Sequence, residues 1–237
     1  MISIESIVIG LVLIFIQLYA LNIVERSPIG EQKLLSLSGG VAISYVFVYI
    51  LPTLHEEQEK LGGSLALDTE LYFLGLLALL VYFVVYAFAE TKGATQQKEQ
   101  TVYMVQISFF MVYTFIISYV VVSSDVQKVE SLFYGLAISL HFIGLSYHLG
   151  KKHRPLHNNR GRYLLGGATL AGAITGGLAP SSGLFVDAMI AFSSGAMLFN
   201  VISKELPFEK EAHLPTFVIS SLLYSTTIIA LKAFFNW

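Results

Sequence analysis

The sequence predicts an all-α, polytopic membrane protein with eight transmembrane helices. Two observations predict this class. Eight apolar segments are each long enough to cross a hydrocarbon core of roughly 30 Å, which needs about 20 helical residues, and positive charge collects in alternate connections between them. Composition agrees, because 55% of the 237 residues are hydrophobic, only 13% are charged and the mean hydropathy is +0.69. Residues 1–237 are therefore expected to form a single transmembrane domain.

The eight predicted spans follow one another with short connections. They cover residues 7–24, 34–52, 71–89, 102–123, 132–149, 163–179, 185–206 and 217–235. We expect the first span to be retained, because its apolar run is longer than the core of a cleavable signal and no basic stretch precedes it. The sixth span is rich in glycine and has small residues at 168, 172 and 176, a spacing that lets two helices approach closely.

Lysine and arginine gather on one side of the predicted bundle. Ten of the 14 lie in the first, third, fifth and seventh connections, five of them within 151–162, and an eleventh, Lys204, lies at the adjoining end of the seventh span. Because short loops rich in these residues stay in the cytoplasm, loop 150–162 is expected there and both termini on the opposite side of the plasma (inner) membrane. Pro155 argues against a helix in this loop. His153 and His157 are therefore not expected to share a metal ion.

Two spans contain the same small motif at the same spacing. Ten residues separate Ser38–Gly40 from Leu51–Pro52, and ten separate Ser193–Gly195 from Leu206–Pro207. The two spans run in opposite directions in the predicted topology, so the sequence predicts an inverted repeat that relates spans one to three and six to eight. Transporters often have such repeats, with a site near the midplane. Close packing at small residues and proline at a helix end are the alternative explanation.

The residue types exclude several function classes. The chain has no cysteine, which excludes disulfides, thiolate metal ligands and cysteine nucleophiles. It contains neither a His-Glu-x-x-His nor a Gly-x-Ser-x-Gly motif, and no basic patch interleaved with aromatic residues. We therefore expect neither an enzyme nor a nucleic-acid-binding protein. The expected partners are membrane lipid, a small solute or cation, and a second copy of the chain in a homodimer.

Three features stand together in this chain: eight spans with outward termini, the glycine-to-Leu-Pro pattern in spans two and seven, and the glycine-rich sixth span. In these features the chain resembles the ZIP family of divalent-metal transporters. The most specific match is Phe192–Pro207 in span seven. The resemblance covers nearly the whole chain and implies a ZIP-like bundle. It also implies a metal site in spans four and five, built by paired motifs of the His-Asn-x-x-Asp/Glu-Gly and His-Glu-x-Pro-His/Gln-Glu kind.

The residues at these ligand positions differ from the family's motifs. The counterpart in span four is Tyr113–Ser118, with Tyr113 where histidine is expected and Thr114 where asparagine is expected. The counterpart in span five is His141–Ser146, in which only His141 is kept. The binuclear metal site implied by the resemblance is therefore expected to be largely lost.

Three positions in spans two and seven belong to the same transport path or vestigial site. Lys204 replaces an acidic residue in span seven, and Tyr49 stands at the partner position in span two. Asn200 lies one turn before Lys204 and is expected to line the same cavity. The Lys204 ammonium is expected either to reach the inner surface or to pair with Glu205 in place of the metal charge.

His141 is the one candidate metal ligand, and zinc binding through it is expected to be weak. Zn²⁺ takes about four nitrogen or oxygen donors, yet the interior of spans four and five contains no carboxylate. His148 lies on the same helical face, but about 10 Å away along the axis at a rise of 1.5 Å per residue. The alternative is a neutral His141 imidazole hydrogen-bonded to a facing hydroxyl such as Tyr113, Thr114 or Ser44.

Two functions remain open from the sequence. The first is a ZIP-like transport protein for a cation or another small solute. The second is a non-transporting ZIP-like membrane protein with a regulatory or structural role. The lost ligands favour the second function, whereas the repeat and the polar interior residues favour the first. Apart from a weakly bound divalent metal such as zinc, no cofactor is expected.

Overall fold

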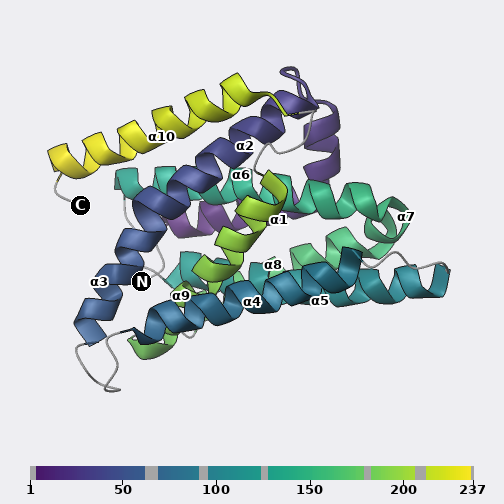
Figure 1. The fold of residues 1–237 in the computed structure, drawn as a ribbon, viewed down its shortest axis with the longest axis horizontal. Coiled ribbons are helices and arrows are strands. Elements are labelled where there is room, and N and C mark those ends of the chain that lie inside the picture. Colours follow the sequence, from purple (N-terminus) through teal and green to yellow (C-terminus); the bar gives the residue numbers. More distant parts are fainter. Residues whose placement is uncertain are drawn as a thin grey trace.

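The computed structural model is an antiparallel bundle of long helices (Figure 1). It describes residues 4–61, 69–90, 96–123, 128–178, 183–205 and 212–235. These residues form α1 (Ile4–Glu25), α2 (Glu31–Tyr45), the π-helix η1 (Val46–Ile50), α3 (Leu51–Leu61), α4 (Glu70–Glu90), α5 (Gln96–Ser123), α6 (Lys128–Lys152), α7 (Arg154–Leu156), the π-helix η2 (His157–Gly161), α8 (Arg162–Leu178), α9 (Leu184–Asn200), the π-helix η3 (Val201–Glu205) and α10 (Leu214–Phe235). Apolar runs fold as helices in hydrocarbon because a helix satisfies its backbone N–H and C=O groups internally.

Seven helices in the described part of the chain are long and apolar enough to cross a membrane, which indicates a membrane protein. They correspond to seven of the eight predicted spans. The remaining span, predicted over 163–179, coincides with α8, which has 17 residues. At 1.5 Å per residue α8 is about 26 Å long, the short end of the range for a span. The all-α class is confirmed, and the eighth span stays a prediction.

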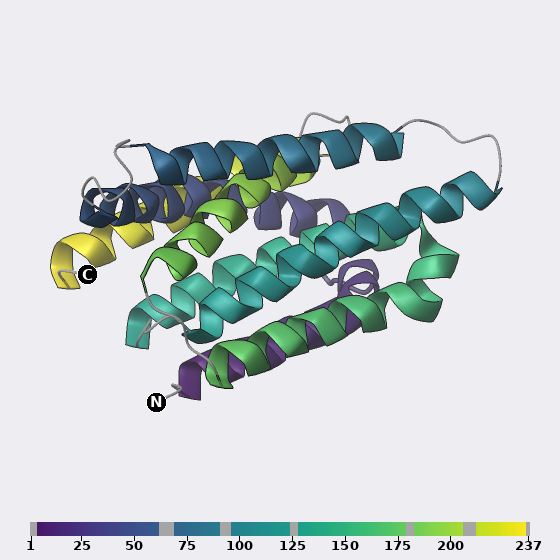
Figure 2. The ribbon, with the colours of Figure 1, turned by 90° about the horizontal axis from the view of Figure 1, so that it is seen from below.

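Successive long helices run in opposite directions, so the described chain begins and ends at the same end of the bundle, which we call the terminal end (Figures 1 and 2). The opposite end holds the α1–α2 connection, the start of α5 and the connection from α6 to α8. Because Arg26, Lys33, Lys151 and Lys152 lie there, we call it the basic end. Figure 2 shows α8 lying alongside α1.

The helices pack in pairs that join distant parts of the sequence. α2 packs against α10, α4 against α9, α5 against α8, and α1 against both α6 and α8. The largest fully buried side chains are aromatic, among them Tyr113, Tyr147 and Phe142. Large apolar side chains such as Leu11 and Leu223 are exposed on the outside of the bundle, as expected for a surface that faces lipid.

A glycine in each repeated motif allows a close helix crossing. A Cβ added at Gly40 would lie well under 3.0 Å from Ser220 Oγ and the Phe217 carbonyl oxygen of α10. A Cβ added at Gly195 would lie equally close to the Gly75 carbonyl oxygen of α4. Only glycine permits such an approach. The small residues of the two repeated motifs therefore serve close packing.

A π-helical turn precedes the Leu-Pro pair in both repeated motifs. η1 ends directly before Leu51, and η3 ends directly before Leu206-Pro207, which lies outside the described residues. The Leu51 N–H donates to the Val46 carbonyl, one residue further back than in an α-helix. This wider turn accommodates Pro52, which has no N–H to donate. The helix continues to Leu61, so the explanation that Pro52 marks a helix end is wrong.

The segment 150–162 is mostly helical and partly buried, which corrects the expectation of a loop. Pro155 lies in the first turn of α7, where its missing N–H has no partner to lose. Its presence therefore does not prevent a helix here, contrary to the prediction. His153 and His157 are only 3% and 2% exposed. They face the protein interior at the basic end.

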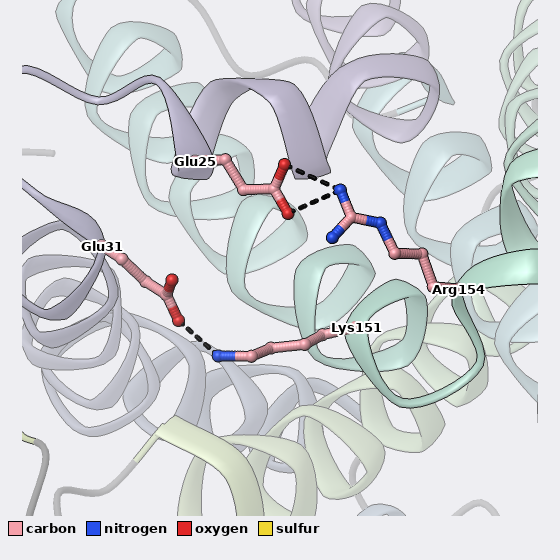
Figure 3. Close-up of polar contacts among 4 residues, drawn as sticks. All are labelled: Glu25, Glu31, Lys151 and Arg154. Carbon is pink, nitrogen blue, oxygen red and sulfur yellow. Dashed lines mark hydrogen bonds and ion pairs between the residues drawn. The ribbon is translucent and has the colours of Figure 1, made fainter.

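Two ion pairs join the hairpin of α1 and α2 to the end of α6 and the start of α7 (Figure 3). Arg154 Nη2 lies 2.9 Å from a Glu25 carboxylate oxygen, and Lys151 Nζ lies 2.6 Å from Glu31 Oε1. All four side chains are partly exposed, and surface pairs contribute only about 0–1 kcal/mol each. These ion pairs neutralise two of the positive charges at the basic end.

Candidate functional site

A cleft at the basic end lies between α4, α5, α6 and α9. Its cavity volume is about 40 Å³, well below the roughly 300–1,000 Å³ of small-molecule sites and enough for a few water molecules. Gln106, His148, Lys152 and Asn200 are the polar residues that line it. Its wall is largely aromatic and includes Tyr82, Tyr86, Phe109, Phe110 and Phe199. Lys152, the lining residue of α6 nearest the basic end, is exposed, so the cleft opens in that direction.

The floor of the cleft separates it from His141. Tyr82 donates its hydroxyl hydrogen to the Phe109 carbonyl at 3.0 Å, and its ring packs edge-on against Tyr113, with the centroids 5.7 Å apart. Behind it, the Tyr113 hydroxyl lies 2.9 Å from His141 Nε2, and both side chains are fully buried. The interpretation of His141 as an imidazole hydrogen-bonded to a facing hydroxyl is thus confirmed for Tyr113.

The Tyr113→Phe variant is expected to lower the free energy of unfolding by about 1 kcal/mol, because it removes a buried hydrogen bond and keeps the packed ring. The measurement is a thermal melt of the purified protein in detergent. Tyr19→Phe, at an exposed tyrosine of α1, is the matched control and should melt like the parent. Equal melting of both variants would show that the 2.9 Å contact contributes nothing to stability.

The structure separates the other predicted site residues. Asn200 lines the cleft, whereas Thr114 is fully buried and donates its hydroxyl to the Met111 carbonyl at 3.3 Å. Tyr49 lies toward the terminal end, and the side chains of Lys204 and Glu205 lie outside the described part of the structure. Of the predicted set, Tyr113 and His141 are brought together and Asn200 faces a cavity.

Two buried histidines lie at the basic end, and one of them contacts a lining residue of the cleft. His153 Nε2 donates to Gln106 Oε1 at 3.1 Å. His157 lies between Gly150 and Gly161, where a Cβ at either position would crowd its ring. Burial, followed by the neighbouring charges of Arg162 and His153, lowers the pKa of His157 to about 4. His157 is therefore neutral in the folded protein at pH 7.

His157 is expected to make the protein less stable in acid. Its pKa is lower in the folded protein than in the unfolded chain, so the unfolded chain binds more protons between about pH 6.5 and 4. The stability of the neutral form is fully present above that window and is lost as the pH falls through it. Melting temperatures at pH 7.5 and 5 should therefore differ less in His157→Gln than in the parent. An equal difference would contradict the lowered pKa.

A cluster of four tyrosines, Tyr45, Tyr49, Tyr134 and Tyr224, fills the bundle toward the terminal end. The rings of the first three lie within 5.9 Å of one another, centroid to centroid, and the Tyr224 hydroxyl donates to the Phe133 carbonyl at 3.1 Å. All but Tyr49 are buried. We call this set the tyrosine cluster.

Two charged side chains border the tyrosine cluster. Tyr49 donates its hydroxyl hydrogen to Glu130 Oε1 at 2.6 Å, and Lys232 Nζ lies 5.5 Å from the centre of the Tyr49 ring. A hydrogen bond to a carboxylate is stronger than one between neutral groups, and a cation over a ring is attracted to it.

A metal centre does not emerge from these residues. Among the described residues, no group of three or more His, Asp or Glu side chains is placed to hold a metal ion. No protein-family model matches the chain, and no curated protein matches it at a significant level. The cleft and the tyrosine cluster are therefore the features that bear on function.

Sequence reasoning missed several residues of both features. Gln106 and Lys152 were not singled out, although Gln106 is a polar residue inside an apolar run and could have been. His148, too far along the helix to share a metal ion with His141, lines the cleft and is half-buried. Glu130 was overlooked because it precedes the fifth apolar segment, and nothing in the sequence shows that Tyr49 lies against it.

Proposed function

We propose that this chain is an inverted-repeat permease for a small solute, on a ZIP-like scaffold of eight spans. The observation that carries the proposal is a difference between the two ends of the bundle. A cleft opens at the basic end, whereas the tyrosine cluster fills the position at the terminal end that corresponds to this cleft under the inverted repeat. Such an arrangement is expected of a transporter whose site opens to one side of the membrane at a time. The excess of positive charge at the basic end favours a cytoplasmic location for that end.

Corresponding helices make corresponding contacts, which supports the inverted repeat. We pair α1 with α8, α2 with α9 and α4 with α10. The contact of α2 with α10 then corresponds to the contact of α9 with α4. If α6 is also paired with α5, the contacts of α6 with α1 and α2 correspond to the contacts of α5 with α8 and α9. These matched contacts are the structural support for a repeat that relates the first three long helices to the last three.

The register of the two halves also agrees. Gly195 follows Gly40 by 155 positions, and η3 follows η1 by the same interval. Each glycine allows the closest approach to the equivalent partner helix. In this register Asn200 corresponds to Tyr45. The equivalent of the cleft at the terminal end is therefore the place that the tyrosine cluster fills.

Single cysteines test the permease directly, because the chain has none of its own. Val85→Cys lines the cleft and Ala137→Cys is fully buried beside the tyrosine cluster. In sealed vesicles, a membrane-impermeant maleimide should label Val85→Cys from the basic side and Ala137→Cys from the terminal side. Ala78→Cys, also fully buried but not in the lining of this cleft, should stay unlabelled.

The same experiment distinguishes the permease from the second function, a non-transporting membrane protein with a regulatory or structural role. Such a protein needs only one arrangement of its helices. Ala137→Cys would then remain as unreactive as Ala78→Cys under all conditions, while Val85→Cys reacted normally. That pattern would refute the permease.

A further inference from the structure

A second cavity lies toward the basic end, between α1 and the start of α8. Its volume is about 20 Å³, which is enough for one particle of the size of a water molecule and too little for an organic solute. Gln17 lines it from α1, His157 lines it from η2, and Arg162 lines it as the first residue of α8. The exposed Asn22 is also part of the lining, so the cavity lies within reach of the surface.

Two buried donors at this cavity make no hydrogen bond within the described structure. Gln17 is 1% exposed, and its Oε1 accepts a hydrogen bond from the Ser146 hydroxyl. Its amide nitrogen Nε2 has no partner, and neither has the buried Nε of Arg162. A buried donor without an acceptor is costly. The cavity therefore favours an occupant that accepts a hydrogen bond from each of these two nitrogens.

The charge at this cavity is positive. The Arg162 guanidinium is always protonated, and its Nη2 donates to the neutral Tyr163 hydroxyl at 2.8 Å. No carboxylate lines the cavity, and within the described part of the chain no carboxylate forms an ion pair with Arg162. An occupant with a negative charge would gain a charge-assisted hydrogen bond here.

The other polar groups of the lining are compatible with an anion. The Tyr103 hydroxyl lies 3.5 Å from His157 Nδ1, and with this nitrogen as acceptor the neutral ring carries its hydrogen on Nε2. The half-buried Asn158 has an amide that can present its NH₂ group. A water molecule would have two hydrogens of its own to donate, whereas the buried groups of the lining are donors. An anion needs donors only.

We infer that this cavity is a binding site for a small monovalent anion, and that chloride is its occupant. Chloride is only slightly larger than water, and it accepts hydrogen bonds from Gln17 Nε2 and Arg162 Nε. It balances the charge of Arg162 and joins α1 to α8 at the basic end. The site is separate from the cleft, and the inference does not depend on the permease.

Thermal melts of the full-length protein in detergent test the inference, with sodium chloride replaced stepwise by sodium gluconate at constant ionic strength. Gluconate is too large for the cavity. The parent is expected to melt several degrees higher in chloride, because an ion that binds only the folded state stabilises it by mass action. Bromide should replace chloride in this effect.

Two variants of the lining should lose the chloride-dependent rise in melting temperature. Gln17→Glu keeps an acceptor for Ser146 but replaces the donor nitrogen with a negatively charged oxygen, which repels an anion. Arg162→Gln removes the positive charge. Arg160→Gln is the matched control, because this neighbouring arginine is exposed and does not line the cavity. It should keep the full rise.

Equal melting of the parent in chloride and gluconate would overturn the inference, and the occupant would then be water. A rise that persists undiminished in both Gln17→Glu and Arg162→Gln would overturn it as well, because chloride would then act on the protein outside this cavity. Size-exclusion profiles of every variant establish that each is folded. The cysteine labelling that tests the permease neither requires nor excludes this site.

Discussion

The Gly195→Ala variant is expected to lose the crossing of α4 and α9 and to fold poorly. Its new methyl group would overlap the Gly75 carbonyl oxygen and approach the Gly75 carbonyl carbon. Backbone atoms cannot rotate away as a side chain does, so the two helices must separate along their contact. We expect a loss of about 3 kcal/mol or more, the upper range for overpacking. The measurement is the melting temperature and monodisperse yield of the detergent-purified protein.

Gly40→Ala and Gly167→Ala complete this experiment. Gly40→Ala is expected to behave like Gly195→Ala, because it crowds Ser220 and the Phe217 carbonyl at the equivalent crossing. Gly167→Ala is the control, because a methyl group there meets nothing within 4 Å, and alanine favours a helix over glycine by about 1 kcal/mol. A Gly195→Ala protein as stable as Gly167→Ala would mean that the two helices do not approach as described.

The Tyr49→Phe variant is expected to open the terminal end of the bundle. It keeps the ring that stacks on Tyr45 and removes only the hydroxyl bonded to Glu130 at 2.6 Å. A hydrogen bond to a charged group contributes about 1.5–3 kcal/mol. If only the closed state makes this bond, its loss shifts the closed-to-open ratio by about tenfold or more. The labelling rate of Ala137→Cys from the terminal side should rise accordingly.

Under the proposed alternating access the two states exclude each other, and Tyr49→Phe should therefore also slow the labelling of Val85→Cys from the basic side. Glu130→Gln is expected to act in the same direction with a smaller effect, since a neutral acceptor remains. Tyr19→Phe, at an exposed tyrosine far from the cluster in sequence, should change neither rate. Faster labelling at both reporter positions would indicate general loosening of the bundle and would contradict a gate.

The long helices could be predicted from the sequence because hydrocarbon leaves few alternatives to a helix. Predictions that depended on proline were less successful. A helix end at Pro52, the alternative explanation of the motif, is wrong, because the helix continues past it through the π-helical turn of η1. The prediction that Pro155 prevents a helix is wrong as well, because Pro155 lies in a first turn, where no hydrogen bond is lost. General rules for proline do not include the position of each residue within its turn.

The sequence predicted a contact of the candidate site only where one residue type by itself required a partner. The pairing of His141 with Tyr113 was among the stated alternatives, because a mid-span imidazole needs a partner and few hydroxyls face it. The cleft depends on where α4 and α9 lie relative to α5 and α6, which no local pattern specifies. The contact between Tyr49 and Glu130 joins residues 81 positions apart. Neither residue pointed to the other in the sequence.

The most direct test of two access states is a distance measurement across the terminal end. Spin labels at Leu136→Cys on α6 and Ile229→Cys on α10, both at exposed positions, report the separation of the helices that flank the tyrosine cluster. Electron–electron double resonance in lipid nanodiscs should show two distance populations, and Tyr49→Phe should enrich the longer one. A single distance distribution, unchanged by Tyr49→Phe, would contradict alternating access.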